Sequence, residues 1–175
     1  MKKDLAVIVG LFLLIVVLLV FGKSFTSLNF VNQATPSSTQ ASGSAQARKS
    51  NGLIPISVRT LNIDAYVASK ASDRKKGLAK RDSLPLNGGM LFVFETKGPY
   101  IFWMKDMKFA IDIIWIDENR RIVDMISNVP AEPGKNDKNL KRYGPRGDAL
   151  YVLEINAGLA NLNGLAVGDQ VNFQL

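Results

Sequence analysis

The chain contains no cysteine and no histidine in its 175 residues. Without cysteine it can form no disulfide, thiol nucleophile or cysteine metal site. Without histidine it can form neither a Ser-His-Asp triad nor a Cys-His pair, and nearly every conventional zinc site is excluded. We therefore expect no metal and no cofactor, and the composition favours a protein that is not an enzyme.

The net formal charge of +7 is spread unevenly along the chain. Residues before position 52 contribute four of these charges, and the 17 basic and 14 acidic residues from Gly52 onward leave only three. A domain that binds phosphate backbones usually has a stronger basic bias. The sequence therefore predicts no nucleic-acid partner.

An uninterrupted apolar run extends from Leu5 to Phe21. As a helix it would cover roughly 25 Å, and with Gly22 and its flanks it can span a bilayer. Lys2 and Lys3 precede the run, which places the N-terminus in the cytoplasm by the positive-inside rule. We predict a cytoplasmic segment 1–4 and an uncleaved transmembrane signal anchor over 5–22. The alternative is a signal peptide whose cleavage secretes the protein, and both put the remainder outside the cytoplasm.

Residues 23–52 are rich in Ser, Ala and Gln, and we predict that they form a flexible tether. Residues 53–175 hold about seven short apolar runs separated by Gly- and Pro-containing turns. Residues 61–68 alternate with period two, and 90–94 is continuously apolar, as in a strand buried on both faces. Ser72 to Arg81 predicts a short helix. We expect a compact, mostly β domain, sandwich- or jelly-roll-like or barrel-like, with one or two short helices.

The run from Arg74 to Asp169 resembles the DUF192 family, also called UPF0127. The resemblance is carried by motifs in the family's order, among them Gly89-Met90-Leu91-Phe92-Val93-Phe94, Phe102-Trp103-Met104-Lys105, Ile111-Asp112-Ile113, Tyr151-Val152-Leu153-Glu154 and Gly168-Asp169. The chain departs from the family pattern at Ala79, Asp106-Met107 and Ala110. The resemblance implies a compact jelly-roll-like β domain, often exported, and no settled activity.

Charged residues interrupt the aromatic stretch from Gly88 to Asp124, and burial of an unpaired charge is costly. We predict a ligand site formed by Arg81, Trp103, Lys105, Asp106, Asp112 and Glu154. In one interpretation, Lys105 faces Asp112, lowers the pKa of its carboxyl group and forms a polar pair beside an aromatic floor. In the other, Asp112 belongs to a buried structural ion pair, for example with Arg81.

Three functions remain open from the sequence. The first is non-catalytic binding of a cell-envelope ligand, either a glycan or another polar molecule. The second is hydrolysis, with Asp112 and Glu154 as acid and base. The third is protein interaction through the loop at 135–146. The cations between Lys70 and Arg81 could grip an anion, but a solvated helix face is the more common role of such a run.

Overall fold

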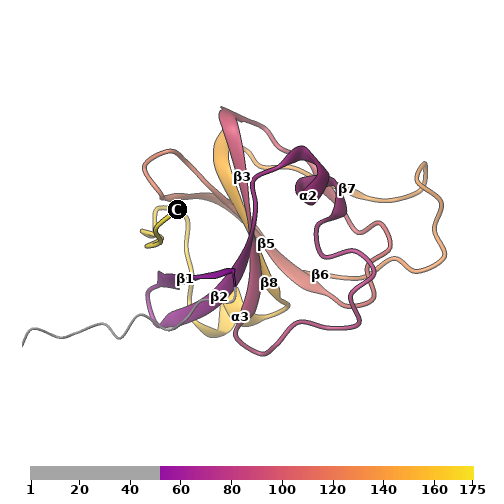
Figure 1. The fold of residues 1–175 in the computed structure, drawn as a ribbon, viewed down its shortest axis with the longest axis horizontal. Helices are drawn as coiled ribbons and strands as arrows, with labels where there is room; N and C mark the ends of the chain where they lie inside the picture. The colour runs from indigo at the N-terminus through magenta and orange to yellow at the C-terminus, as the bar shows by residue number, and fades with distance from the viewer. Residues whose placement is uncertain (1–51) are drawn as a thin grey trace, which may run out of the picture. The chain divides into compact units, whose positions relative to one another are not determined.

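The computed structural model describes residues 52–175 (Figure 1). The predicted anchor at 5–22, and the tether except for Gly52, lie outside this range. Among residues 52–175 no helix is long and apolar enough to cross a membrane. The elements in chain order are β1 (Leu53–Val58), β2 (Leu61–Ala68), α2 (Ala71–Lys76), β3 (Gly88–Gly98), β4 (Phe102–Trp103), β5 (Ile111–Ile116), β6 (Ile122–Val129), β7 (Arg142–Tyr143), β8 (Ala149–Asn156) and α3 (Leu159–Leu162).

Six of these strands form one mixed sheet in the order β1-β2-β3-β8-β5-β6. Its pairs are antiparallel except β2 with β3, which run parallel. A parallel pair needs a crossover connection, and here residues 69–87 supply it and carry α2. The short strands β4 and β7 pair separately as a second sheet.

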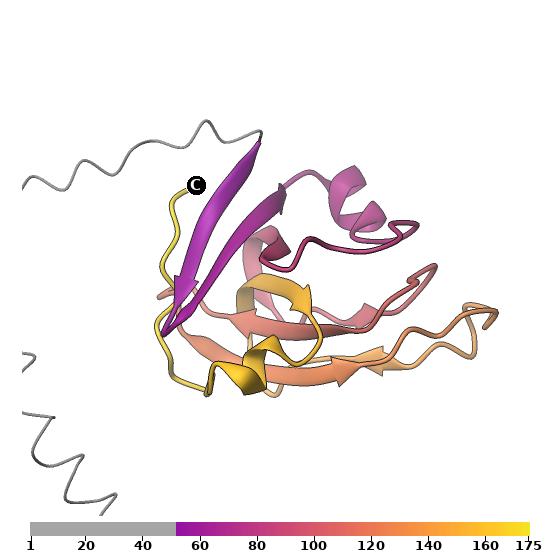
Figure 2. The same cartoon turned by 90° about the horizontal axis from the view of Figure 1, so that it is seen from below.

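The expectation of a mostly β domain with two short helices is confirmed for residues 52–175, but this part of the chain forms no closed barrel. The edge strands β1 and β6 do not pair with each other. Instead, the C-terminal segment forms single bridges to both sides, Ser57 with Asn172 and Arg121 with Gln170. Figure 2 shows this segment running beside β1. The edges are thus joined through isolated bridges and not through a continuous ladder.

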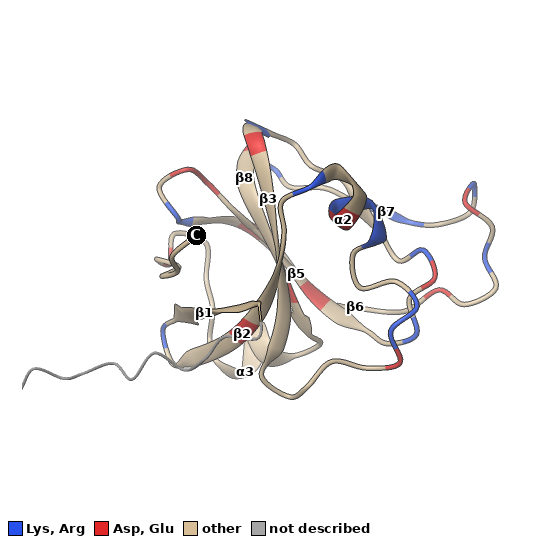
Figure 3. Cartoon of the chain, viewed as in Figure 1, with Lys and Arg blue, Asp and Glu red and all other residues tan. Residues whose placement is uncertain are grey.

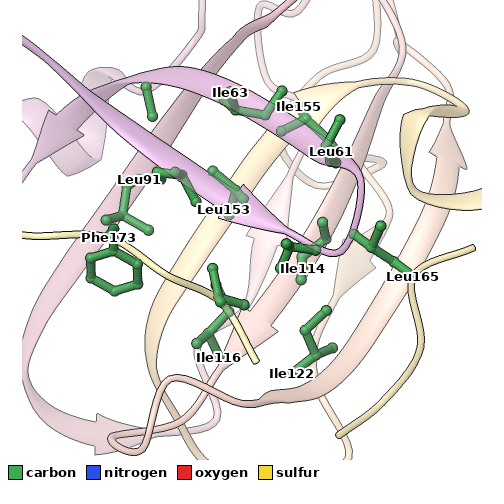
Figure 4. Close-up of a cluster of buried hydrophobic side chains, with 14 of the residues drawn as sticks. Leu61, Ile63, Leu91, Ile114, Ile116, Ile122, Leu153, Ile155, Leu165 and Phe173 are labelled. Carbon is green, nitrogen blue, oxygen red and sulfur yellow. The ribbon is translucent and has the colours of Figure 1, made fainter. Parts of the chain in front are cut away.

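Apolar side chains are buried on both faces of the sheet, as the period of a strand requires. One cluster contains Leu91, Ile114 and Leu153 (Figure 4), whereas their chain neighbours Ile113 and Val152 belong to a second cluster. All six residues of β5 are buried. A strand enclosed on both faces needs apolar residues at every position, which explains the unbroken apolar runs in the sequence.

Helix α2 is shorter than the predicted 72–81 helix and begins one residue earlier. Its N-cap is Lys70 in place of the expected Ser72. The helix ends at Gly77, which has a φ of +50° and donates its N–H to the carbonyl oxygen of Asp73 at 2.8 Å. Glycine reaches positive φ at little cost, so the helix ends here. Lys80 and Arg81 therefore lie in the turns that follow.

Candidate functional site

A cleft of about 900 Å³ opens over the face of the sheet that carries the second apolar cluster. The buried side chains of Phe92 and Glu154 lie at its base. Segments from four parts of the chain complete the lining. These are α2 with the turn after it (Arg74 to Lys80), Phe94 on β3, Tyr100 to Trp103, and the segment Lys105 to Met107 with Asp137 beside it.

Aromatic side chains form one wall of this cleft. Phe94 and Tyr100 stack with their ring centroids 3.4 Å apart, and Phe102 meets Phe92 edge to face at 4.9 Å. The indole of Trp115 donates a 2.8 Å hydrogen bond to the carbonyl oxygen of Tyr100, which fixes the start of this wall. Buried or partly buried aromatic contacts of this kind hold side chains in place. The wall is therefore preformed.

Trp103 extends the aromatic wall toward solvent. Its side chain is 40% exposed, and the guanidinium of Arg142 lies 4.7 Å from the ring centroid. The two residues are paired across the small β4–β7 sheet, so the cation–π contact is supported by the backbone. Trp103 can contact a molecule that enters from solvent.

Glu154 occupies the centre of the sheet, on β8 between β3 and β5. Its direct neighbours are Met90 and Ile113, both apolar. The residue is only 5% exposed, and no side chain or backbone group within 52–175 forms a hydrogen bond with its carboxyl group. Burial raises the pKa of Glu154 to about 8. At neutral pH the group therefore carries a proton and can donate it in a hydrogen bond.

The carboxyl group of Glu154 is open to the cleft. In the part of the chain that the structure describes, no fully buried side-chain oxygen or nitrogen lacks a hydrogen-bond partner. Since the Glu154 oxygens have no such partner, they must keep some exposed surface, and Glu154 is one of the lining residues. The carboxyl group thus faces the space that a ligand would fill.

Cationic side chains from α2 and from the turn after it also line the cleft. Arg74 is fixed there because its guanidinium donates hydrogen bonds to the carbonyl oxygens of Ser69 and Val93 and lies over the Phe94 ring. Lys75, Lys76 and Lys80 are exposed. Figure 3 shows the concentration of basic residues at α2 and β7. This side of the cleft is electropositive.

Lys105 pairs with Asp137 and not with Asp112. The Lys105 ammonium donates to the Asp137 carboxylate, and this hydrogen bond raises the pKa of Lys105. Both side chains are about half exposed at the rim of the cleft. Asp106, beside them, has a φ of +56° and its carbonyl oxygen accepts the Lys80 N–H at 3.0 Å. The rim is thereby connected to the turn after α2.

Asp112 is fully buried and serves the fold. Its carboxylate accepts backbone N–H bonds from Asn128, Gly158 and Ala160 at 2.8–2.9 Å. These donors belong to the end of β6 and to the start of α3, so one side chain joins three segments. The pairing of Asp112 with Lys105, or with Arg81, is not what the structure shows. A buried carboxylate requires hydrogen-bond donors, and here backbone N–H groups supply them in place of a cation.

Arg81 also lies apart from the cleft lining. Its guanidinium is 4.3 Å from the centroid of the Tyr66 ring. Of the six predicted site residues, the structure therefore brings together Trp103, Lys105, Asp106 and Glu154.

Sequence reasoning missed two contributors to the cleft: the aromatic base and wall at Phe92 and Tyr100, and Asp137. The α2 cations were visible as a charge run, but a solvated face was the more common interpretation. No local pattern pairs Asp137 with Lys105, because 32 positions separate them.

The loop at 135–146 is fastened to the domain in the structure. Leu140 is buried, and the N–H of Lys141 donates to Glu132 at 3.0 Å. The loop ends at Arg146, whose backbone and side chain both donate hydrogen bonds to Asp124.

The acidic residues of the neighbouring hairpin are engaged in hydrogen bonds. Asp124 accepts from Arg146, and Asp117 accepts the backbone N–H of Arg121 at 2.7 Å. Residues 52–175 contain no group of three acidic, His or Cys side chains placed to hold a metal ion.

The DUF192 family, described as "Uncharacterized ACR, COG1430", matches residues 54–173, and the chain belongs to this family. It is 30% identical over 90 residues to UPF0127 protein TK1120 of Thermococcus kodakarensis. That alignment covers 50% of this chain and spans about half (52%) of the relative.

Two crystal structures share the fold. One is a protein of unknown function from Novosphingobium aromaticivorans, with 28% identity and a TM-score of 0.63, covering 78% of this chain and 99% of that chain. The other, described as a "putative transcription regulator" from Sinorhizobium meliloti, has 25% identity and a TM-score of 0.62, covering 69% of this chain and 93% of that chain.

Proposed function

We propose that residues 53–175 form a non-catalytic module that binds a polar cell-envelope ligand, a glycan segment, in the cleft between α2 and the aromatic wall. One observation carries this proposal: a cleft of about 900 Å³ combines an aromatic wall with the Glu154 carboxyl group, which has no hydrogen-bond partner among residues 52–175. Volumes of roughly 300–1,000 Å³ with mostly apolar walls and a few polar groups are typical of small-molecule sites.

A sugar fits both parts of this lining. The C–H face of a pyranose ring is apolar and packs on aromatic rings such as Tyr100 and Trp103, while its hydroxyl groups need hydrogen-bond partners. Glu154 and the rim residues Lys105 and Asp106 offer those partners. A purely apolar ligand would leave the buried Glu154 carboxyl group without one, at a cost in free energy.

Binding is favoured over hydrolysis by the arrangement of the carboxylates. Asp112 pairs in register with Ile155, the residue after Glu154, so the side chains of Asp112 and Glu154 point to opposite faces of the sheet. An acid and a base must flank the same glycosidic bond. The pair that the sequence offered for hydrolysis therefore cannot act on one substrate.

We further propose that the module is held outside the cytoplasm by the segment at 5–22. The supporting observations are the apolar run and the two lysines before it. Because the chain lacks cysteine, a single Ser50→Cys variant gives a clean test in intact cells. A membrane-impermeant maleimide should label Cys at position 50 without cell lysis. Labelling only after lysis would contradict this location, and labelled protein in the medium would indicate cleavage.

Binding is tested with the purified full-length protein and two tetrasaccharides, tetragalacturonate and its neutral methyl ester. Trp103 lies on the cleft, so we expect an oligosaccharide to change the tryptophan emission. The change should be lost in Trp103→Ala. It should persist in Leu162→Ala, a control on the exposed face of α3, and the sugar should be recovered intact. An equal response in Trp103→Ala would contradict binding at this cleft, and cleaved sugar would contradict a non-catalytic role.

A further inference from the structure

The position of Glu154 is not explained by the needs of the fold. Its neighbours across the sheet, Met90 and Ile113, would suit an apolar side chain, and burial of a carboxyl group among such residues is unfavourable. The other buried acidic residues are engaged: Asp112 accepts three backbone N–H groups, and Asp124 is bound to Arg146. Glu154 alone of these three faces a cleft without a hydrogen-bond partner in the described range.

The second observation is the charge of the cleft. Lys75, Lys76 and Lys80 line it, and none of them forms an ion pair with any residue in 52–175. The lining as a whole has five cationic side chains and, besides Glu154, two acidic residues, Asp106 and Asp137. A concave site with an excess of one sign attracts ligands of the opposite sign. The cleft is therefore suited to an anion.

We propose that Glu154 and the three lysines select a ligand that bears a carboxylate, such as an acidic sugar, with Glu154 donating its carboxyl proton to the ligand carboxylate. This inference rests on the proposed binding function and names its ligand class. One negative charge is then shared by two carboxyl groups, and the nearby lysines offset it. The bottom of the cleft is largely buried, and each additional charge placed there adds a desolvation cost. A monoanionic carboxylate therefore suits this position better than a dianionic phosphate.

Binding by this arrangement depends on pH through Glu154. The groups that face it across the strands are apolar, and the charged groups around the cleft are Arg74 and the three lysines on one side and Lys105, Asp106 and Asp137 at the rim. Burial raises the pKa of Glu154 to about 8, so the donor is present below that pH. Above it, two carboxylates would repel each other across the cleft. The affinity should therefore fall as the pH rises through about 8.

The experiment compares tetragalacturonate with its methyl ester by calorimetry on the full-length protein at pH 6 and pH 9. At pH 6 we expect the anionic sugar to bind at least about tenfold more tightly than the ester. Its affinity should fall at least about tenfold at pH 9, about the loss expected of a hydrogen bond to a charged group. Glu154→Gln keeps a donor at both pH values, so its affinity should change little with pH, whereas Glu154→Ala should bind weakly at both.

A lysine pair completes the test. Lys76→Ala should weaken binding of the anionic sugar and leave the ester unaffected. Lys108→Ala removes an exposed lysine outside the cleft lining, so it should change the affinity for neither the anionic sugar nor the ester. Equal affinity for sugar and ester, or a pH dependence that persists in Glu154→Gln, would overturn the inference while the binding function stands. If neither compound binds, the proposed function fails and the inference fails with it.

Discussion

Asp112 and Glu154 lie on adjacent strands one residue out of register, and their side chains point to opposite faces of the same sheet. Asp112 pairs with Ile155, and Glu154 pairs with Ile113. On one face the Asp112 carboxylate is bound by three backbone N–H groups, and on the other the Glu154 carboxyl group has no partner within 52–175 and meets a cleft. Two buried acidic residues thus have different surroundings, since one is held by backbone N–H groups and the other lines a cleft.

Asp112→Asn should destabilise the domain. Asparagine offers one acceptor oxygen, and its NH₂ group would face backbone donors, so at least one N–H would lose its partner. Each buried donor left unpaired costs about 1–3 kcal/mol, and we expect a loss of about 3 kcal/mol in the free energy of unfolding. Urea denaturation at pH 7 measures it. Asp106→Asn, at an exposed residue with positive φ that asparagine tolerates, is the control. Wild-type stability of Asp112→Asn would contradict the structural role.

Glu154 should make the wild-type protein less stable as the pH rises from about 4.5 to 8. The pKa of this group is raised in the folded state, from 4.5 to about 8, so the folded state holds a proton that the unfolded state has released in this window. The free energy of unfolding then falls by about 1 kcal/mol per pH unit. Glu154→Gln removes this dependence. Its free energy of unfolding should equal that of wild type near pH 4 and exceed it at pH 8.

Urea denaturation at pH 4, 6 and 8 checks this expectation. Glu95→Gln, on the exposed part of β3, controls for the loss of one negative charge. If the difference between Glu154→Gln and wild type is the same at pH 4 and pH 8, the carboxyl group of Glu154 does not titrate as its burial requires.

The sequence alone was sufficient to recognise the family and to predict most of the strands. A continuous apolar run such as Met90 to Phe94 is typical of a strand buried on both faces. The alternation at 61–68 is typical of a strand buried on one face. Glu154 could be singled out for the same reason, because it interrupts an apolar run at 149–155. A polar residue within such a run is visible without any knowledge of its surroundings.

The partners of these residues could not be predicted, because they depend on register and on distant segments. Asp112 bonds to positions 128, 158 and 160, and Lys105 to position 137. A shift of one residue along β5 would move Asp112 to the other face of the sheet. The parallel pairing of β2 with β3 was likewise not expected, since nothing in either strand distinguishes it from an antiparallel pair. Composition identified the residues but could not place them.

Gly89→Ala should destabilise the sheet at the point where it supports Glu154. A Cβ atom at position 89 would lie 2.8 Å from Cγ2 of Ile63 and 3.0 Å from the backbone oxygen of Glu154. The backbone oxygen cannot move without disturbing β8, and overpacking typically costs about 1–3 kcal/mol. Gly147→Ala is the matched control, since its nearest neighbour would be Cβ of Val123 at 3.9 Å. Thermal denaturation of both variants measures the difference, and equal melting temperatures would contradict this packing.

Arg146→Ala should weaken the attachment of the loop at 135–146 in a pH-dependent manner. The side chain of Arg146 donates to the Asp124 carboxylate at 2.7 and 3.0 Å, and these bonds are the main reason that the pKa of Asp124 lies below its usual value. A carboxyl group with a lowered folded pKa contributes stability above its unfolded value of 3.8, and this is lost as the pH falls through the folded pKa. Because the Arg146 side chain is largely exposed and its ion pair is screened by solvent, we expect only a small loss in the free energy of unfolding at pH 7.

The difference in the free energy of unfolding between wild type and Arg146→Ala should therefore shrink below about pH 3.8. In this range Asp124 becomes protonated first in the unfolded state and then in the folded state. Denaturation by urea at pH 7 and pH 2.5 measures it. Lys108→Ala breaks an ion pair in which both side chains are exposed, so it should cost little at either pH. Since Asp124 also accepts the backbone N–H groups of Met125 and Arg146, part of its stabilisation should survive in Arg146→Ala and disappear in Asp124→Ala. Equal losses in these two variants would mean that the side-chain bonds alone hold the loop.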